Sequence, residues 1–338
     1  MKEIEVEKAV GTVLAHDLTQ IIPGEYKGPR YKKGHVIREE DIPLLLSMGK
    51  KHLYVVEKGD ADIHEDEAAR RIAQSAAGPG VLLKGPSEGK MEIFSDIDGL
   101  LKINVDLLRH LVEQDDIMFS CIKENQLVKK GMKVAGTRVI PLFVNPGVVD
   151  TAEEILNQGT LIQVKPLRSH KVGLVTTGSE VYSGRVQDGF GPVLKKKFEA
   201  LGSEVVQQYF ADDDEDMISE KIHRLIQEGV DIIGVTGGMS VDPDDKTPSG
   251  IRRAGGHIVT YGAPVLPGAM FLLAYIDNIP VVGLPGCVMY ARTSIFDLVV
   301  PRILAGENLT RGDIKRLAHG GLCMECAVCT YPNCGFGK

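Results

Sequence analysis

Short apolar runs alternate with helical stripes between Lys171 and Gly306, and this alternation constrains the fold more than any other feature of the 338-residue chain. Runs typical of buried strands are Val172–Val175, Glu204–Phe210 and Val230–Val235. The segments between them carry apolar residues at helical spacing, as in Leu194, Phe198 and Leu201, or Ile218, Ile222 and Leu225. Strands that alternate with helices predict an α/β fold, a doubly wound and mostly parallel sheet with helices on both faces.

The end of this region predicts a hairpin and a final helix. Ala269–Ile276 and Pro280–Leu284 flank the turn residues Asp277 and Asn278. A last helix is expected from Val288 to Ala305, with a kink at Pro301 and an end at Gly306.

A smaller N-terminal region of mixed α+β and β-rich character is expected before this sheet. Helices are predicted from His64 to Ala77 and from Val105 to Val112, and Val128–Val144 alternates like a small β-rich module. We therefore expect four parts, with boundaries at residues 1–80, 81–165, 166–312 and 313–338.

Charge and hydropathy exclude several classes of protein. The net charge of −7 disfavours a broad nucleic-acid-binding face, which normally carries a basic excess. The N-terminus shows no apolar segment behind a basic start, and no apolar stretch is long enough to span a bilayer. We expect a cytoplasmic protein with no membrane or nucleic-acid partner.

Three Gly-rich, hydroxyl-rich loops follow the predicted strands. Ligands of open α/β sheets bind beyond the carboxyl ends of the strands, where Gly lets backbone N–H groups approach an anion. Gly makes up 38 residues of the chain, and close approach to a ligand accounts for such an excess. The candidate binding residues in the three loops are Thr176, Thr177, Gly178, Ser179, Gly237, Gly238, Ser240, Thr247, Pro248, Pro285 and Gly286.

Acidic residues accompany these loops, with Glu180, Asp188 and Asp245 as the candidate catalytic groups. Carboxylates beside a phosphate are expected where Mg²⁺ lies between them. The alternative is that Asp244 and Asp245 cap the helix that starts near Thr247. Asp212–Asp216 is interpreted as a solvated helix start.

The order of these motifs resembles the molybdopterin-binding domain. Thr176-Thr-Gly-Ser-Glu180 is followed by Asp188, by Thr236-Gly-Gly-Met-Ser240 with Asp245-Lys-Thr-Pro248, and by Leu284-Pro-Gly286. That domain is shared by molybdenum insertases of the MoeA/gephyrin type, adenylyltransferases of the MogA/MoaB type and CinA-type proteins. The resemblance covers about Lys171 to Gly306 and implies molybdopterin, or its adenylate, as ligand. It gives Glu180 and Asp245 to the pterin and metal site and places Asp188 and Thr247-Pro248 beside the adenylyl-transfer site.

The N-terminal segments Gly11–Asp17 and Lys33–Gly49 resemble the start of insertase chains, although Leu284-Pro-Gly286 continues with Cys287 instead of the usual Asn-Pro. Cys287 is interpreted as a buried free thiol. The resemblance implies a transferase that inserts molybdenum or transfers an adenylyl group, with ATP or AMP, molybdate and a recipient molybdoenzyme as partners and a homo-oligomeric state. Two alternatives remain open: a non-catalytic molybdopterin carrier or chaperone, and a CinA-like enzyme that cleaves nucleotides.

Four cysteines crowd the C-terminus in the spacing Cys323-x2-Cys326-x2-Cys329-x4-Cys334. Clustered cysteines in a cytosolic chain indicate metal or redox chemistry instead of disulfides. The consecutive x2 spacings are similar to those of 4Fe–4S proteins, and four thiolates also suit structural Zn²⁺. A reactive tail without metal is the third possibility.

Overall fold

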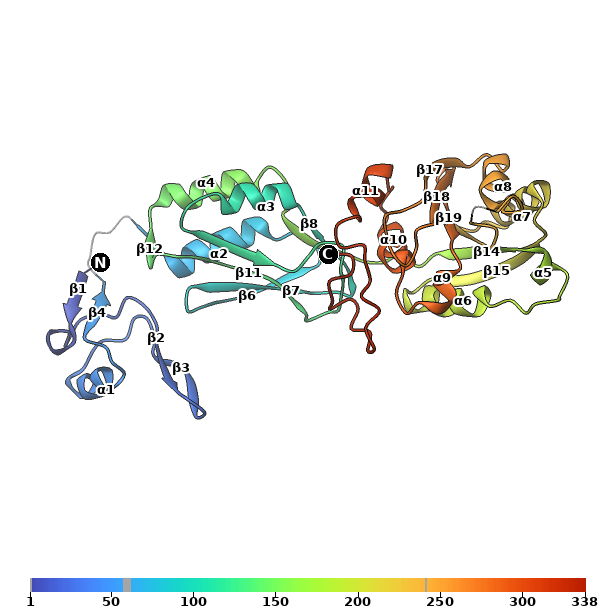
Figure 1. Ribbon diagram of the computed structural model, residues 1–338. Helices are drawn as coiled ribbons and strands as arrows, with labels where there is room; N and C mark the ends of the chain where they lie inside the picture. The colour runs from blue at the N-terminus through green and yellow to red at the C-terminus, as the bar shows by residue number, and fades with distance from the viewer. Residues whose placement is uncertain (1, 57–61, 241) are drawn as a thin grey trace. The chain divides into compact units, whose positions relative to one another are not determined.

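The computed structural model describes the chain except for residues 1, 57–61 and 241. The chain forms two compact units, shown in Figure 1. The first unit comprises Met1–Phe94, Asn104–Ile122 and Lys133–Ile162, and the second comprises Ser95–Ile103, Lys123–Met132 and Gln163–Lys338. Nowhere in the described part of the chain does a helix have the length and apolar character needed to cross a bilayer.

The N-terminal part of the first unit is built from two pairs of strands and short helices. Strands β1 (Lys2–Glu5) and β4 (His52–Val55) pair antiparallel, and β2 (Leu18–Ile22) forms a hairpin with β3 (Tyr26–Tyr31). Helix α1 (Ile42–Ser47) and the 3₁₀ turns at Val6–Lys8 and Glu39–Asp41 complete it. Its small core contains Val6, Leu14, Ile37, Leu45, Leu53 and Val55.

The rest of the first unit combines helices with a four-stranded sheet of order β6-β7-β11-β9. These strands are Val81–Ser87, Lys90–Ser95, Lys133–Val139 and Ile117–Cys121, and β11 pairs antiparallel with β7 and β9. The short strands β5 (Ile63–His64) and β12 (Phe143–Val144) pair beside it. The helices are α2 (Glu65–Ala76), α3 (Val105–Val112) and α4 (Pro146–Leu156), so both helices predicted here are confirmed.

A six-stranded sheet of order β15-β14-β16-β19-β18-β17 dominates the second unit. Strands β14 (Lys171–Thr177), β15 (Glu204–Ala211), β16 (Ile232–Thr236) and β19 (Ile279–Leu284) run parallel. Strands β18 (Leu272–Ile276) and β17 (His257–Tyr261) extend the sheet antiparallel, and β18 with β19 is the predicted hairpin. A separate three-stranded sheet joins β10 (Leu127–Val128), β8 (Gly99–Ile103) and β13 (Ile162–Lys165).

Helices cover both faces of the six-stranded sheet, as a doubly wound fold requires. On one face Leu194 and Phe198 of α6 (Phe190–Ala200) and Phe296 of α10 (Ile295–Leu304) pack with Val172 and Leu174. On the other, Ile218 and Ile222 of α7 (Glu215–Gln227) and Ile251 of α8 (Thr247–Arg253) pack with Val175 and Val235. Figure 1 shows α7 and α8 across the sheet from α6. The predicted fold class is confirmed.

The final predicted helix is interrupted before the expected kink. A short helix, α9 (Cys287–Tyr290), ends before α10 begins at Ile295, and Pro301 lies inside α10. Ser294 caps α10 with its hydroxyl, while the Asp297 carboxylate accepts the backbone N–H of Ser294 at 2.8 Å. This reciprocal cap fixes a helix start at Ile295, so the prediction of one helix from Val288 was wrong at this point.

Candidate functional site

The three predicted loops leave the same edge of the six-stranded sheet. The parallel register pairs Thr177 with Ala211, Thr176 with Thr236, and Thr236 with Leu284. These residues are the last or nearly the last of their strands, so the chain segments that follow them start side by side. The carboxyl edge of the sheet therefore carries Thr177–Glu180, Gly237–Ser240 with Asp242–Pro248, and Pro285–Gly286, which together we call the edge loops.

Buried hydroxyl groups hold the first two edge loops together. The Thr247 hydroxyl donates to the carbonyl oxygen of Gly237 at 2.9 Å and therefore accepts from the Thr177 hydroxyl, 3.0 Å away. Thr176 accepts from the Gln208 side-chain amide at 3.0 Å and from the Thr236 hydroxyl at 3.3 Å. These threonines are at most 3% exposed. Their hydroxyls thus hold the loops in position from inside the fold.

Gly237 lies where the two loops touch backbone to backbone. Its φ is +85°, and a Cβ atom there would lie 2.2 Å from the carbonyl oxygen of Thr177. The φ of Gly238 is +50°, and a Cβ atom at this position would lie 3.0 Å from the Thr247 hydroxyl oxygen. Only Gly has both the left-handed conformation and the space, so the loop geometry depends on this pair.

Carboxylates gather at this edge. Asp213, in the turn after β15, accepts the backbone N–H of Ser179 at 3.0 Å. Burial is the main reason that the pKa of Asp213 is raised; the Ser179 N–H opposes the rise, and the negative charges of Asp212, Glu180 and Asp245 add to it. Glu180, Asp245 and Asp213 therefore form one negatively charged group, which we call the edge carboxylates.

Asp213 is a member of this group that the sequence interpretation missed. Asp212–Asp216 was expected to be a solvated helix start, and Asp214 does cap α7 by accepting the N–H of Met217 at 2.8 Å. Asp213 instead turns back to the first edge loop. The sequence signal that could have identified Asp213 is its position just after a parallel strand. The other loops were selected by the same rule.

Asp245 folds its own loop without capping α8. Its carboxylate accepts the backbone N–H of Asp242 at 2.8 Å, and its own N–H donates to the Asp242 carbonyl at 3.0 Å. Helix α8 has no side-chain cap, so the alternative of a capping role for Asp244 or Asp245 is wrong. The nearby Tyr261 hydroxyl has its pKa raised by burial first and by the charge of Asp245 second.

Asp188 organises the start of α6. Its carboxylate accepts the backbone N–H groups of Phe190 at 2.9 Å and Gly191 at 3.1 Å. It also accepts the side-chain amide of Gln208 at 2.7 Å, and this amide in turn reaches Thr176. These contacts make Asp188 a helix cap that is tied to the sheet.

The third edge loop leads directly into α9 through Pro285 and Gly286. Cys287, the first residue of α9, is half-buried, and burial is the main cause that raises the pKa of its thiol. A thiol of this kind stays protonated near neutral pH. It behaves as a small apolar side chain, in line with the interpretation from sequence.

Comparison with known proteins identifies the domain that carries the edge loops. Residues 173–305 match the family profile described as "Probable molybdopterin binding domain". A second profile, described only as a domain of unknown function, matches residues 3–57.

Individual relatives match shorter stretches of this chain. A CinA-like protein of Mycobacterium avium is 34% identical over 97 residues, which is 29% of this chain and 22% of that protein. A CinA-like protein of Mycobacterium sp. strain MCS is 36% identical over 85 residues, covering 25% of this chain and 20% of that protein. The matches therefore span about a fifth of the length of these relatives.

Solved structures with detectable similarity are distant. The molybdopterin biosynthesis enzyme MoaB of Thermus thermophilus is 22% identical, with a TM-score of 0.32 over 41% of this chain and 98% of that chain. The molybdopterin biosynthesis MoeA protein of Pyrococcus horikoshii is 16% identical, with a TM-score of 0.36 over 93% of this chain and 76% of that chain.

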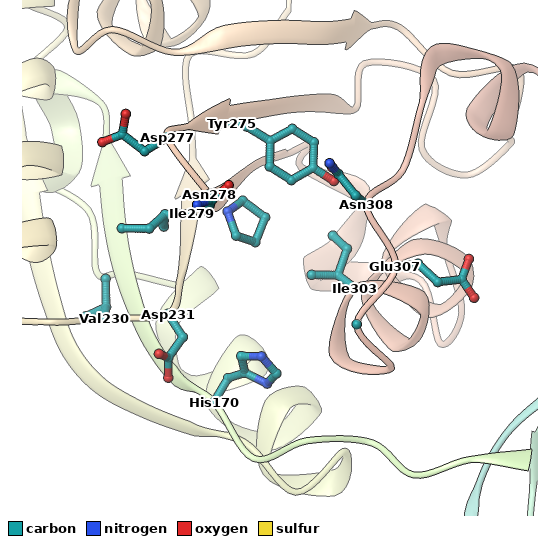
Figure 2. A pocket seen from close by; sticks show the side chains of 12 residues that line it. His170, Val230, Asp231, Tyr275, Asp277, Asn278, Ile279, Ile303, Glu307 and Asn308 are labelled. Atoms are coloured by element: carbon teal, nitrogen blue, oxygen red, sulfur yellow. The ribbon is translucent and has the colours of Figure 1, made fainter. Parts of the chain in front are cut away.

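A hollow on the opposite edge of the molybdopterin-binding domain contains none of the predicted site residues. It has a volume of about 440 Å³, and Figure 2 shows its lining. His170 precedes β14, Asp231 precedes β16, and Asp277 and Asn278 form the turn before β19. These are the amino ends of the strands, where open α/β sheets do not bind their ligands. The edge loops thus remain the candidate site.

The predicted metal sites are not formed as the side chains stand. Within the described residues, no group of three or more His, Cys, Asp or Glu side chains is placed to hold a metal ion. Cys326 and Cys329 are exposed, while Cys323 and Cys334 are half-buried. Neither the Mg²⁺ site nor the iron–sulfur or zinc site is supported by this arrangement.

Proposed function

We propose that this chain is a cytoplasmic protein of molybdenum-cofactor biosynthesis that binds molybdopterin, or its adenylate, at the edge loops. The observation that carries the proposal is the family profile over residues 173–305, which covers all three loops. The binding residues are those predicted from sequence, with the buried threonines as positioning groups and Gly178, Ser179, Gly237, Gly238 and Ser240 lying closest to the ligand.

We propose that a cation accompanies the ligand at this edge, because of the charge of the edge carboxylates. Molybdopterin carries a phosphate, and the edge carboxylates would repel it. Mg²⁺ takes one or two carboxylates together with phosphate oxygens, so Asp245 with Glu180 or Asp213 offers suitable donor chemistry. When bound, Mg²⁺ supplies positive charge that offsets the charge of the phosphate.

The activity that fits this site is transfer, either of molybdenum from molybdate or of an adenylyl group from ATP. Asp245 and Glu180 hold the cation side of the site, and Asp188 fixes the start of α6 behind the first edge loop. We further propose a homo-oligomer that hands the cofactor to a recipient molybdoenzyme. A non-catalytic carrier would use the same loops without turnover.

Asp245→Asn is the sharpest test, because Asn keeps an oxygen that can accept the Asp242 N–H while it removes the charge. The full chain is incubated anaerobically with molybdopterin, Mg-ATP and molybdate, and products are identified by mass spectrometry. Turnover is expected to fall about 100-fold or more. Asp244→Asn, the exposed neighbour, is the matched control. Unchanged turnover in Asp245→Asn would contradict the assignment, and binding without any turnover would favour the carrier.

A second candidate function is cleavage of nucleotides by a CinA-like activity. The 34% identity over 97 residues to a CinA-like protein favours it. Hydrolysis of a pyridine or sugar nucleotide by the full chain, with no affinity for molybdopterin, would establish this alternative.

A further inference from the structure

The C-terminal segment after α11 (Arg311–Arg316) is a loop whose two ends are tied together. The N–H of Gly337 donates to the carbonyl of Gly320 at 2.8 Å. Near its start, Leu266 donates to Gly321 and Cys323 donates back to Leu266, both at 2.8 Å. The loop therefore begins and ends at one place on the second unit, and all four tail cysteines lie between the two ends.

Two aromatic residues anchor the returning half of this loop in the core. Phe336 is 4% exposed and belongs to the core cluster that contains Phe296 and Leu298 of α10. The Tyr331 hydroxyl donates to the carbonyl of Asp297 at 2.9 Å. Cys323 and Cys334 pack against the same cluster, so the outer pair of thiols already has a fixed position.

The stretch between these anchors lacks an internal source of order. Residues 324–332, all of them described, donate no backbone N–H to a backbone carbonyl. Met324 and Val328 are 79% and 74% exposed, and Cys326 and Cys329 are exposed as well. Besides the Tyr331 hydroxyl near its end, one side-chain contact holds this arc, from the Arg292 guanidinium to the carbonyl of Ala327 at 3.0 Å. Ligation of its exposed thiols by a metal would fix such a segment, as structural metals do in small domains with little core of their own.

We propose that Cys323, Cys326, Cys329 and Cys334 bind one metal centre through four thiolates, and that the arc 324–332 closes around it. The outer two thiols pack against the core cluster, and the inner two are exposed on a segment that donates no backbone N–H to a backbone carbonyl, so closure would have to move only the part of the arc before Tyr331. Each thiol releases its proton to solvent on binding. Four thiolates at these spacings suit a single Zn²⁺ or a single iron–sulfur cluster, which share this ligand chemistry.

The metal centre would lie beside the segment that connects α9 to α10. The Thr293 hydroxyl is 3.9 Å from the Cys323 sulfur, and Arg292 contacts the arc. These two residues connect α9 to α10. The centre itself is independent of the proposed function, because its ligands and anchors lie outside the edge loops.

The test uses the full chain, purified anaerobically and reconstituted with Zn²⁺ or with iron and sulfide. Metal and acid-labile sulfide per chain, together with the visible absorbance of an iron–sulfur cluster, distinguish the two. We expect about one Zn²⁺ or one cluster per chain. The double variant Cys326→Ser/Cys329→Ser is expected to lose this metal, whereas Cys121→Ser, a half-buried cysteine of β9, keeps it.

Proteolysis gives a second readout that does not depend on metal analysis. Glu325 lies in the arc, so a glutamate-specific protease should cut there in the double variant and in the metal-stripped chain, and much more slowly in the loaded chain. Reconstituted protein that holds no stoichiometric metal, or a double variant that retains full metal content, would overturn the proposal. Tail cysteines that mass spectrometry finds paired as disulfides in the anaerobic protein would overturn it as well.

Discussion

The contact between Gly237 and the carbonyl of Thr177 makes a residue-scale prediction. Gly237→Ala must accommodate a Cβ atom 2.2 Å from a backbone oxygen while keeping a φ of +85°. We expect the free energy of unfolding of the second unit to fall by about 3 kcal/mol. Gly255→Ala is the matched control, because its φ is +88° and nothing lies within 4 Å of the new atom. Gly255→Ala should lower the free energy of unfolding by about 1 kcal/mol, because only the left-handed backbone conformation opposes the new side chain.

Denaturant unfolding of both variants measures this difference, and molybdopterin affinity should weaken only in Gly237→Ala. Equal losses of stability at the two positions would show that the contact between the loops does not constrain Gly237.

Asp213 makes stability depend on pH. Its pKa in the folded state lies above the ordinary value of 3.8, chiefly because of burial. The folded state therefore holds this proton more tightly than the unfolded chain does. Binding of this proton therefore stabilises the folded state. This stabilisation is fully present below the pKa of Asp213 in the unfolded chain, and it is lost as the pH rises through the pKa of Asp213 in the folded state. Asp213→Asn has no such proton to lose, so its free energy of unfolding should decline less over this range.

Urea unfolding at several pH values from about 4 upward measures the slope. Asp214→Asn, which keeps a cap on α7, is the matched variant. If the free energy of unfolding changed with pH equally in Asp213→Asn and Asp214→Asn, the raised pKa of Asp213 and its interaction with the other edge carboxylates would be contradicted.

At the residue scale, the sequence located the edge loops but not the direction of their side chains. Parallel strand ends must share an edge, and the loops were predictable for that reason. The inward hydrogen bonds of Thr176, Thr177 and Thr247 depend on register and packing, which no single segment encodes. Asp213 was missed because it lies in the acidic run Asp212–Asp216, and a helix start at this run, such as the cap formed by Asp214, is enough to account for its charge.

At the scale of elements, the sequence predicted those helices and strands whose apolar residues follow a single clear periodicity. Helix α7 has a clear apolar stripe, and the hairpin of β18 and β19 surrounds a two-residue turn. Strand β17 was not predicted, because its edge position leaves most of its residues only partly buried and weakens the apolar pattern. The break before α10 was missed because the cap formed by Ser294 and Asp297 lies within a long apolar stretch.

The packing of the tail on α10 leads to a prediction about this pair of elements. Phe336 is buried in the core cluster that also contains Phe296 and Leu298 of α10. Phe336→Ala should lower the free energy of unfolding of the second unit by about 3 kcal/mol through the cavity it leaves. Met324→Ala, at a residue 79% exposed, is the control and should change little.

Calorimetry or denaturant unfolding of the second unit checks both variants. A Phe336→Ala protein as stable as Met324→Ala would mean that the tail does not contribute to the core.

On the scale of the whole molecule, the features on which our proposals rest lie in the second unit. The family profile, the edge loops and the four tail cysteines all belong to it, while residues 3–57 match a domain without known function. The domain limits at residues 80, 165 and 312 remain a proposal. Residues 95–103 and 123–132 cluster with the second unit, although they lie in the middle region of the sequence. A local sequence pattern cannot predict this, because it depends on the pairing of strands that are far apart in the chain.

Hydrogen–deuterium exchange on the full chain, with and without molybdopterin and Mg²⁺, tests the central claim most directly. We expect slower exchange in residues 176–180, 236–247 and 285–287, and no change in residues 277–280 and 306–308, which line the hollow at the opposite edge. Protection confined to that hollow, or no protection in either place, would contradict the assignment of the edge loops as the molybdopterin site.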